Sequence, residues 1–526
     1  MSDSIRSRDT GGILGGTLLL TLSVLLVKIL GVIFKIPLAA YLGDQGMGYF
    51  NSAYTVYSFF YLICTAGVPK AVMILEGRAE DGVCSAQRVG VAMKFFALLG
   101  TVCTLVLLFF ASPLAHFAGS PGARESIILI APSVIFVAVM GVLRGKLTAD
   151  RAFTDIAFSQ VIEGAGRLLF GLLLARFAIS RAMPYKDASA LTILGVTVGS
   201  ALGLLYLLIR YKTSKVKYIS RQNAHLSRKE RRRVIKEILK ISLPITLSAG
   251  VMSCSGIIDL SLVMRGLSTL GYSESESVAL YGNYTTLAVP MLGLATALIS
   301  PVALSFVPLF SAYSGKGDTE RLKLTVRASV YGVSSIAIPM AFALYFFGED
   351  ILSLLFPGSD TSLGAALLRL LSPSALLSGW LLVINSLLEA DGMPKAPLYS
   401  MALGSLVKLI LGAILVGRAE IGIASAPIGT TACYLIALLV SLGTLLAKKR
   451  INPSLLASSH TQILASIVAT TLTIPLFKFG ESRGLGGYFT LLSLGFFGFI
   501  YVILTALGLL LSREKRKYIA IYTKRA

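Results

Sequence analysis

The stretch Val27-Lys-Ile-Leu-Gly-Val-Ile-Phe-Lys-Ile-Pro37 decides the class of fold to which this chain belongs. It lies within the first long apolar run, about residues 12–42, and Lys28 is too far from either end of that run to be a flanking residue. Lys28 and Lys35 are seven residues apart, which places them on one face of an α-helix. An ammonium group facing lipid is costly, so we expect this face to turn toward a protein interior or a wet cavity. Such a cationic cavity favours an anionic substrate, although Lys35, close to Asp44, could instead reach the far interface by snorkelling.

The composition identifies a polytopic membrane protein. Charged residues make up 14% of the 526 residues and apolar residues 55%, whereas a soluble domain carries about 25% charged residues. The net charge is +22, but Lys and Arg are concentrated in short segments between apolar runs, where they encode membrane topology. This distribution disfavours a nucleic-acid partner and favours anionic membrane lipids.

Fourteen apolar segments are long enough to cross a bilayer, at about 20 residues for each span. Basic segments follow spans two, four, six, eight and twelve; after span four they include Lys146 and Arg151. The positive-inside rule then predicts a cytoplasmic-membrane protein with both termini in the cytoplasm. The predicted spans are residues 14–41, 46–75, 88–113, 124–146, 154–178, 188–210, 239–264, 279–310, 324–347, 363–388, 396–417, 420–447, 460–479 and 487–511.

Two halves of the chain resemble each other. Ala131-Pro132-Ser133 matches Ser372-Pro373-Ser374 at an offset of 373 − 132 = 241, and Asn51 matches Asn283 at 283 − 51 = 232. Six spans in each half is an even number, so an axis along the membrane normal would relate the halves. We predict an all-α fold with two six-helix bundles related by a parallel pseudo-two-fold repeat, and two further helices. The predicted domains are an N-terminal bundle (1–211), a basic cytoplasmic linker (212–238), a C-terminal bundle (239–448), and two extra transmembrane helices with a basic tail (449–526).

The basic segment from Arg210 to Lys240 holds twelve Lys and Arg residues and two Glu residues. Near its end, four apolar residues share one helical face, which predicts a segment lying along the inner leaflet. Attraction of this linker to anionic lipid explains the charge better than nucleic-acid binding does. The four residues are Val234, Ile235, Ile238 and Leu239.

Polar residues inside the spans are the candidates for substrate binding. Glu163 and Arg167 are spaced i, i+4 and can pair on one helix face, in a structural role or as substrate ligands. Arg265 could instead anchor the outer interface, and Asn51 and Asn283 could hydrogen-bond between helices. The predicted substrate-binding residues are Lys28, Lys35, Asn51, Lys70, Glu163, Arg167, Arg265 and Asn283.

No signature of a soluble enzyme is present. The sequence has no GxxxxGK[ST] phosphate loop and no HExxH motif. Its five Cys and three His residues are scattered, so they form no recognisable metal-ligand set or Ser-His-Asp set. We therefore expect no enzymatic activity, no cofactor and no metal.

Two segments carry a resemblance to a known family. Lys28-Ile-Leu-Gly31, Lys35-Ile-Pro37, Leu42-Gly43-Asp44-Gln-Gly46-Met47-Gly48 and Thr65-Ala66-Gly67-Val68-Pro69 together resemble the opening of SpoVB-like members of the MOP exporter superfamily (multidrug, oligosaccharidyl-lipid and polysaccharide exporters). Glu389-Ala-Asp391-Gly392-x-Pro394-Lys395-x-Pro397 resembles the segment that enters span eleven in that family. The resemblance covers essentially the whole chain, and within the superfamily it is to the SpoVB/MurJ-type flippases of peptidoglycan precursors.

The resemblance implies a monomeric flippase that moves lipid II, the undecaprenyl-pyrophosphate-linked disaccharide-pentapeptide, outward by alternating access. It implies a basic cavity for the pyrophosphate, with the first-helix basic position at Lys28, and a groove for the lipid tail along the last two spans. It also implies a role in peptidoglycan synthesis, either in vegetative wall growth or in sporulation. The chain departs from the family at Tyr284, where relatives carry a basic residue, and at Lys408, in the span where some relatives bind sodium.

Other functions remain open at this point. The chain could flip another lipid-linked polysaccharide unit, or it could be a MATE-like multidrug/ion antiporter, although cationic drugs suit an acidic cavity better than a basic one. From a different class, a membrane glycosyltransferase would need catalytic carboxylates in a large outer loop, and the outer loops here are short. A non-transporting membrane scaffold would tolerate the substitution Lys28→Ala.

Overall fold

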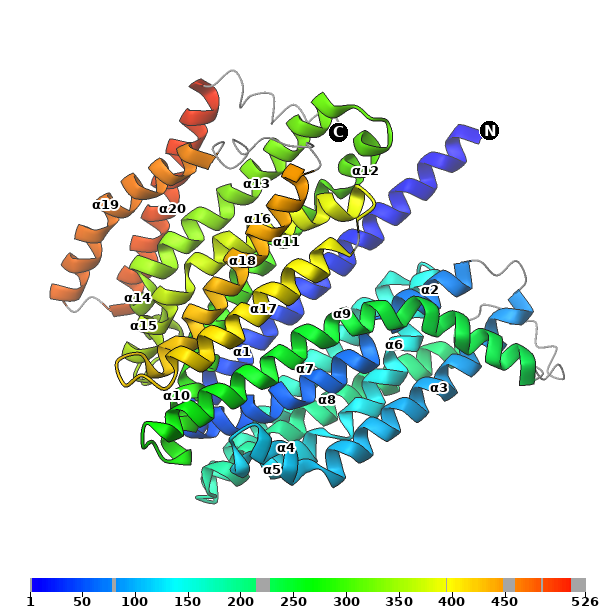
Figure 1. The fold of residues 1–526 in the computed structure, drawn as a ribbon, viewed down its shortest axis with the longest axis horizontal. Helices are drawn as coiled ribbons and strands as arrows, with labels where there is room; N and C mark the ends of the chain where they lie inside the picture. The colour runs from blue at the N-terminus through cyan, green and yellow to red at the C-terminus, as the bar shows by residue number, and fades with distance from the viewer. Residues whose placement is uncertain are drawn as a thin grey trace. The chain divides into compact units, whose positions relative to one another are not determined.

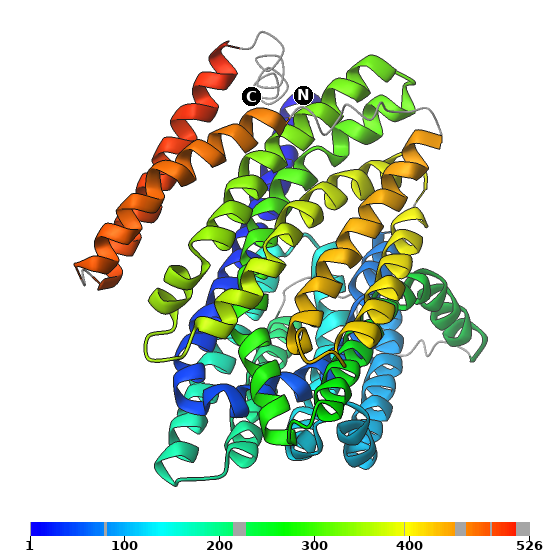
Figure 2. The same ribbon diagram turned by 60° about the vertical axis from the view of Figure 1, so that its left-hand side comes forward.

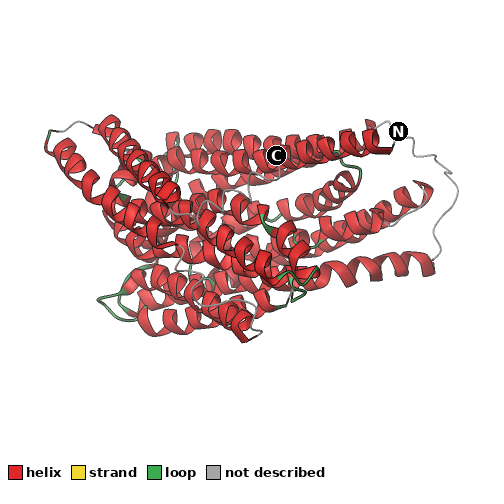
Figure 3. Cartoon of the chain, turned by 90° about the horizontal axis from the view of Figure 1, so that it is seen from above, coloured by secondary structure: helices red, strands yellow, loops and turns green. Residues whose placement is uncertain are grey.

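A computed structural model describes residues 2–77, 82–213, 228–393, 395–447, 459–483 and 486–511. These residues are helical apart from short connections, and no strand occurs among them (Figure 3). Within them, ten helical segments are long and apolar enough to cross a membrane, or eleven if the bent pair Pro121–Ile130 and Ser133–Ala149 is one span. The predicted all-α, multi-pass membrane fold is therefore confirmed, whereas the predicted number of fourteen spans is not.

The helices form two compact units (Figure 1). Unit 1 comprises Met1–Ser268 and Tyr272–Gly282, and unit 2 comprises Thr269–Gly271 and Asn283–Ala526. This division follows helix contacts, whereas the predicted domains follow a sequence repeat, so the domain boundaries stay a prediction. Much of the predicted linker (214–227), the segment 448–458 and the basic tail after residue 511 lie outside the described residues.

Unit 1 begins with a helix that covers the first predicted span and most of the second, which ends in the next helix. This helix bends at Gly43, where φ is +59°, a backbone conformation that favours glycine. The elements of unit 1 are α1 (Ser2–Thr65), α2 (Val68–Gly77), α3 (Gly82–Phe109), α4 (Ala111–Phe117), η1 (Pro121–Ala123), α5 (Arg124–Ile130), α6 (Ser133–Ala149), α7 (Phe153–Ser180), α8 (Tyr185–Thr213), α9 (Arg228–Thr269) and most of α10 (Glu274–Asn283).

Glycine allows three helices of unit 1 to pack closely. A Cβ atom added to Gly195 of α8 would lie 2.5 Å from the backbone of Gly171 in α7, so α7 and α8 run in direct backbone contact (Figure 1). On α7, Gly164 contacts Leu30 of α1, and Gly171 contacts Phe34 of the same helix. The two-lysine stretch of α1 therefore lies alongside residues 164–171 of α7.

Proline interrupts the predicted spans four and ten at corresponding places. Span four is the pair α5 and α6, which bend by 42° where Pro132 separates them. Span ten is α15 and α16, with Pro373 as the first residue of α16. Unit 2 contains η2 (Tyr284–Ala288), a π-helix, then α11 (Val289–Ser305), α12 (Val307–Gly315), α13 (Thr319–Phe346), α14 (Gly348–Leu355), α15 (Ser362–Leu371), α16 (Pro373–Ala390), α17 (Ala396–Leu415), η3 (Gly422–Ala424), α18 (Ser425–Ala447), α19 (His460–Ser482) and α20 (Gly486–Leu511).

The last two helices, α19 and α20, lie side by side (Figure 2). Aromatic packing joins them to the end of α13, since the ring of Phe347 stacks on Phe477 at 4.4 Å and meets Phe497 edge-on at 5.7 Å. Two polar contacts also cross to α13: Tyr501 Oη donates to the carbonyl of Ser335 at 3.1 Å, and Gln462 Nε2 donates to that of Tyr331 at 3.4 Å. Hydrogen bonds of this kind hold helices together in hydrocarbon.

Candidate functional site

Three charged side chains meet where α6 packs near α7 in unit 1. Arg144 Nη2 donates to Glu163 Oε2 at 2.9 Å, and Arg144 Nε donates to Ser159 Oγ at 3.1 Å. Arg167 follows Glu163 by one helical turn, and its Nη2 lies 3.9 Å from Glu163 Oε1. Two guanidinium groups and one carboxylate leave this Arg144–Glu163–Arg167 cluster with one net positive charge.

The two arginines of the cluster differ in their hydrogen bonding. Arg144 makes two hydrogen bonds, to Ser159 and Glu163, and its side chain is 17% exposed. Arg167 makes only the long contact to Glu163, its side chain is 27% exposed, and its Nε is buried without a hydrogen-bond partner among the described residues. A guanidinium carries five N–H donors, and a buried donor without an acceptor costs about 1–3 kcal/mol. Arg167 therefore has a donor that the described residues do not use, whereas Arg144 is held by two hydrogen bonds.

A ladder of tyrosines on α1 lies within electrostatic reach of Arg167. The ring centroids of Tyr54 and Tyr57 are 5.6 Å apart, and those of Tyr57 and Tyr61 are 5.7 Å apart. Tyr57 is buried, and Tyr54 and Tyr61 are partly exposed. A tyrosine presents an apolar ring and a polar hydroxyl, so this surface suits a ligand with both apolar faces and polar groups.

The predicted residues of α1 belong to the helix that packs against α7. Lys35 is partly buried, and Lys28 lies in α1, but its side chain lies outside the described part of the structure. Asn51 is buried, and its backbone carbonyl accepts a hydrogen bond from Thr55 Oγ1 at 2.8 Å. The α1–α7 packing thus joins the two-lysine helix to the helix that carries Glu163 and Arg167.

The three remaining residues that were predicted to bind substrate lie on helices α2, α9 and α10. Lys70 is exposed near the start of α2. Arg265 is exposed on α9, and its guanidinium stacks over the ring of Phe117 at 5.6 Å. In unit 2, Asn283 is buried at the end of α10, and its Nδ2 donates to the carbonyl of Asp360 at 3.4 Å. Participation of these three residues in substrate binding stays a prediction.

Sequence reasoning missed Arg144 and a second buried group of charges. Lys146 Nζ lies 3.0 Å from Glu76 Oε2 and 2.7 Å from Asp150 Oδ1, which ties α6 to α2. The side chains of Lys146 and Glu76 are 7% and 3% exposed, so Lys146 is not the loop charge that the sequence analysis assumed. The i, i+4 spacing of Lys146 and Asp150 was the available signal for part of this group.

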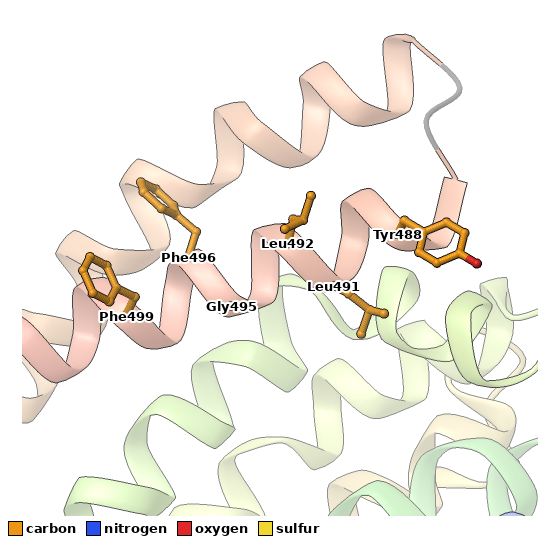
Figure 4. Close-up of a pocket in the computed structure, with 6 residues that line it drawn as sticks. All are labelled: Tyr488, Leu491, Leu492, Gly495, Phe496 and Phe499. Carbon is orange, nitrogen blue, oxygen red and sulfur yellow. The ribbon is translucent and has the colours of Figure 1, made fainter.

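An open apolar groove of about 640 Å³ lies along α20 in unit 2 (Figure 4). All the residues that line it belong to this one helix, and Figure 4 shows their side chains along it. The lining residues are Tyr488, Leu491, Leu492, Gly495, Phe496 and Phe499. The groove has the apolar character of a surface that faces hydrocarbon, and α20 is the last of the predicted spans.

Two family models match the chain. The model described as "Polysaccharide biosynthesis protein" matches residues 13–314, and the model described as "MatE" matches residues 244–414. The chain belongs to the polysaccharide biosynthesis protein family.

Individual relatives connect this polysaccharide biosynthesis family protein to flippases. It is 23% identical over 436 residues to the stage V sporulation protein B of Bacillus subtilis (strain 168), covering 81% of this chain and 82% of the relative. It is 22% identical over 434 residues to the lipid II flippase MurJ of the same organism, covering 77% of each chain. A solved structure described as "Lipid II flippase MurJ, inward closed conformation" shares the fold, with a TM-score of 0.72, 15% identity and coverage of 94% of this chain and 99% of that chain. The resemblance to SpoVB- and MurJ-like members of the MOP exporter superfamily is thereby confirmed.

Proposed function

We propose that this protein is a flippase that moves an anionic lipid-linked glycan across the cytoplasmic membrane, with lipid II as the substrate. The observation that carries the proposal is the Arg144–Glu163–Arg167 cluster, in which a positive charge lies among membrane helices with donors of Arg167 not used by the protein. Such charge is costly to place there unless it serves a substrate or a path. The lipid II flippase MurJ, a relative over most of the chain, supports the choice of lipid II.

The chemistry of the substrate fits these groups. A pyrophosphate presents several anionic oxygens, and a guanidinium can donate to two of them in parallel. Arg167 would contact the pyrophosphate, assisted by Lys28 and Lys35 from α1. Glu163 would hold Arg144 in position rather than touch the substrate, and the tyrosine ladder would face the sugars. The polyprenyl tail would stay in hydrocarbon along α20.

The proposed architecture is that of fourteen spans in two six-helix bundles that rock about a midplane site, plus α19 and α20. The order of elements supports an internal repeat: α3 and α13 both have 28 residues, and each is followed after one residue by a short helix, α4 or α14. Asp150 and Asp391, which match in the sequence repeat, are the C-cap residues of α6 and α16. Each also receives a side-chain hydrogen bond, from Lys146 Nζ at 2.7 Å or from Ser314 Oγ at 2.6 Å.

A second candidate is the export of another lipid-linked polysaccharide unit, which the description of the matching family favours. Such a substrate would present the same pyrophosphate to Arg167 and would differ only in its sugars. The MatE match raises multidrug antiport as a further alternative. A net positive cluster repels cationic drugs, so we rank antiport below both flippase functions.

The test measures how much lipid II reaches the outer leaflet in cells that depend on this protein. We expect Arg167→Gln to reduce outward lipid II by about tenfold or more, since a hydrogen bond to a charged group contributes about 1.5–3 kcal/mol. Arg176→Gln is the matched control, because Arg176 lies on the same helix and is exposed. Lys28→Ala should act like Arg167→Gln.

Two outcomes would decide against the proposal. Normal lipid II at the outer leaflet after depletion of the protein, or with both Arg167→Gln and Lys28→Ala, would remove the flippase function. Proteoliposomes separate the two flippase candidates, because they can be loaded with lipid II or with another undecaprenyl-pyrophosphate glycan. Transport of the second lipid alone would reassign the substrate.

A further inference from the structure

The first part of α9 extends beyond the length that a membrane span requires. The helix is continuous from Arg228 to Thr269, 42 residues, which at 1.5 Å per residue is about 63 Å. The hydrocarbon core of a bilayer is about 30 Å thick. Part of α9 therefore has to leave the hydrocarbon, and the charged residues between Arg228 and Lys240 identify which end does so.

This first part is fixed to unit 1 by one face. Val234 and Ile238 are buried in an apolar cluster with residues of α2, α3 and α6, among them Val72, Phe96 and Val142. They are four residues apart, so they anchor a single side of the helix. The two anchors fix which residues of this part of α9 point away from the protein.

The side opposite the anchors is basic. Lys229, Arg232, Lys236 and Lys240 are exposed and spaced so that they form one stripe along the helix, which we call the α9 basic stripe. Arg233, beside the stripe, forms an ion pair with Glu237 at 3.2 Å. Between Arg228 and Lys240 there are seven basic and two acidic residues, so this part carries 7 − 2 = +5.

On this same exposed side of α9, the residues change from basic to apolar within about one turn. Leu239, Leu243 and Leu247 continue the line of the α9 basic stripe toward the centre of the helix, and all three are exposed. A change from cationic to apolar residues on one exposed side is the pattern expected where a helix passes from lipid headgroups into hydrocarbon. A nucleic-acid surface would not require the exposed leucines.

We propose that the α9 basic stripe binds the headgroup phosphates of anionic phospholipids in the leaflet where α9 enters the membrane. The stripe supplies four cations in fixed positions, and the leucines beyond Lys240 set the depth at which these cations meet the headgroups. Binding is electrostatic and selects lipids by charge. It does not depend on which lipid-linked substrate the protein transports.

The test compares two variants of the full-length protein in detergent, with the same loss of charge. The stripe variant carries Lys229→Gln, Arg232→Gln, Lys236→Gln and Lys240→Gln. The control carries Arg181→Gln, Lys186→Gln, Lys316→Gln and Lys395→Gln, which are also exposed positions. Native mass spectrometry measures the affinity for phosphatidylglycerol and for phosphatidylcholine. We expect the stripe variant to lose about tenfold or more in affinity for phosphatidylglycerol, because several cations near the surface contribute together.

The control should retain wild-type affinity for phosphatidylglycerol, and phosphatidylcholine should bind both variants equally weakly. Circular dichroism of the stripe variant checks its fold, and we expect no change because the four side chains are exposed. Equal loss in the stripe variant and the control would overturn the proposal, since charge alone would then explain binding. Displacement of phosphatidylglycerol by a short DNA duplex at the same ionic strength would also overturn it and assign the stripe to nucleic acid.

Discussion

Buried charges in this protein are stabilised by partners on other helices, and Lys146 gives the sharpest test. Replacing Lys146 with Met removes the ammonium group that lies 3.0 Å from the carboxylate of Glu76, whose side chain is only 3% exposed. Breaking a buried ion pair by removing one partner costs about 3–5 kcal/mol. We expect Lys146→Met to lower the Tm of the purified protein substantially, as measured by circular dichroism on heating in detergent.

The matched control is Lys323→Met. Lys323 pairs with Glu320 at 3.2 Å, but the two side chains are 44% and 85% exposed, and pairs in contact with solvent contribute about 0–1 kcal/mol. Equal shifts in Tm for the two variants would contradict the assignment of Lys146 to a buried group.

Spacing along one helix predicted some of these charge pairs and missed others. The sequence places Glu163 and Arg167 one turn apart, but the shorter contact of Glu163 is to Arg144, at 2.9 Å and on another helix. Lys146 lies near the end of a predicted span and was therefore assigned to a loop. The spacing of residues along one helix does not show which neighbouring helix packs against its end. The burial of Lys146 and Glu76 between α6 and α2 therefore could not be predicted.

At the scale of elements, α10 packs closely against α1 near its bend at Gly43, because both helices carry a glycine at the contact. A Cβ on Gly48 would lie 2.0 Å from the carbonyl oxygen of Val278, and a Cβ on Gly282 would lie 2.0 Å from that of Asp44. We expect Gly48→Ala to force the helices apart at a cost of about 1–3 kcal/mol, as overpacking does. Thermal unfolding measures the loss.

Gly293→Ala on α11 is the comparison for this substitution. A Cβ there meets no atom within 4 Å, so alanine should be neutral or slightly stabilising, since it favours helix by about 1 kcal/mol over glycine. If Gly48→Ala were equally tolerated, the contact would not be as close as described.

Neither proline nor charge alone determined where the helices end. Pro132 and Pro373 lie at breaks between helices, because proline lacks the N–H that continues the helical hydrogen-bonding pattern, whereas Pro37, Pro301 and Pro339 lie inside helices. Residues 228–238, in contrast, were assigned to a linker, and the structure includes them in α9. The apolar face near the end of this linker was expected to lie along the inner leaflet, but Val234 and Ile238 pack on α2, α3 and α6 instead. Tertiary packing outweighed composition in this segment.

For the whole molecule, the predicted count of fourteen spans, an even number, places both termini in the cytoplasm. A green fluorescent protein fused after Ala526 should therefore fluoresce, because it folds in the cytoplasm. Alkaline phosphatase inserted after Arg483, between α19 and α20, should be active, because that turn is predicted to face outward. Phosphatase activity at the C-terminus instead would mean an odd number of spans.

The family and the membrane class could be predicted from the sequence, because they depend on long apolar runs and on motifs such as Leu42-Gly43-Asp44. The candidate site could be predicted only in part. Glu163, Arg167 and the lysines of α1 stand out as charges in apolar sequence, whereas Arg144 resembles any residue at the end of a span. The ion pair between Arg144 and Glu163 forms between two helices, so it could be found only once the packing of α6 near α7 was known.

The change from lysine and arginine to leucine along α9 has a mechanical consequence for unit 1. If the α9 basic stripe binds headgroups as proposed, the packing of α9 on α2, α3 and α6 sets the vertical position of unit 1 in the bilayer to within about one helical turn, roughly 5.4 Å. A thinner or thicker bilayer cannot then be accommodated by sliding this unit up or down. The surrounding lipids would have to stretch or compress instead, so this protein would be sensitive to the thickness of the membrane.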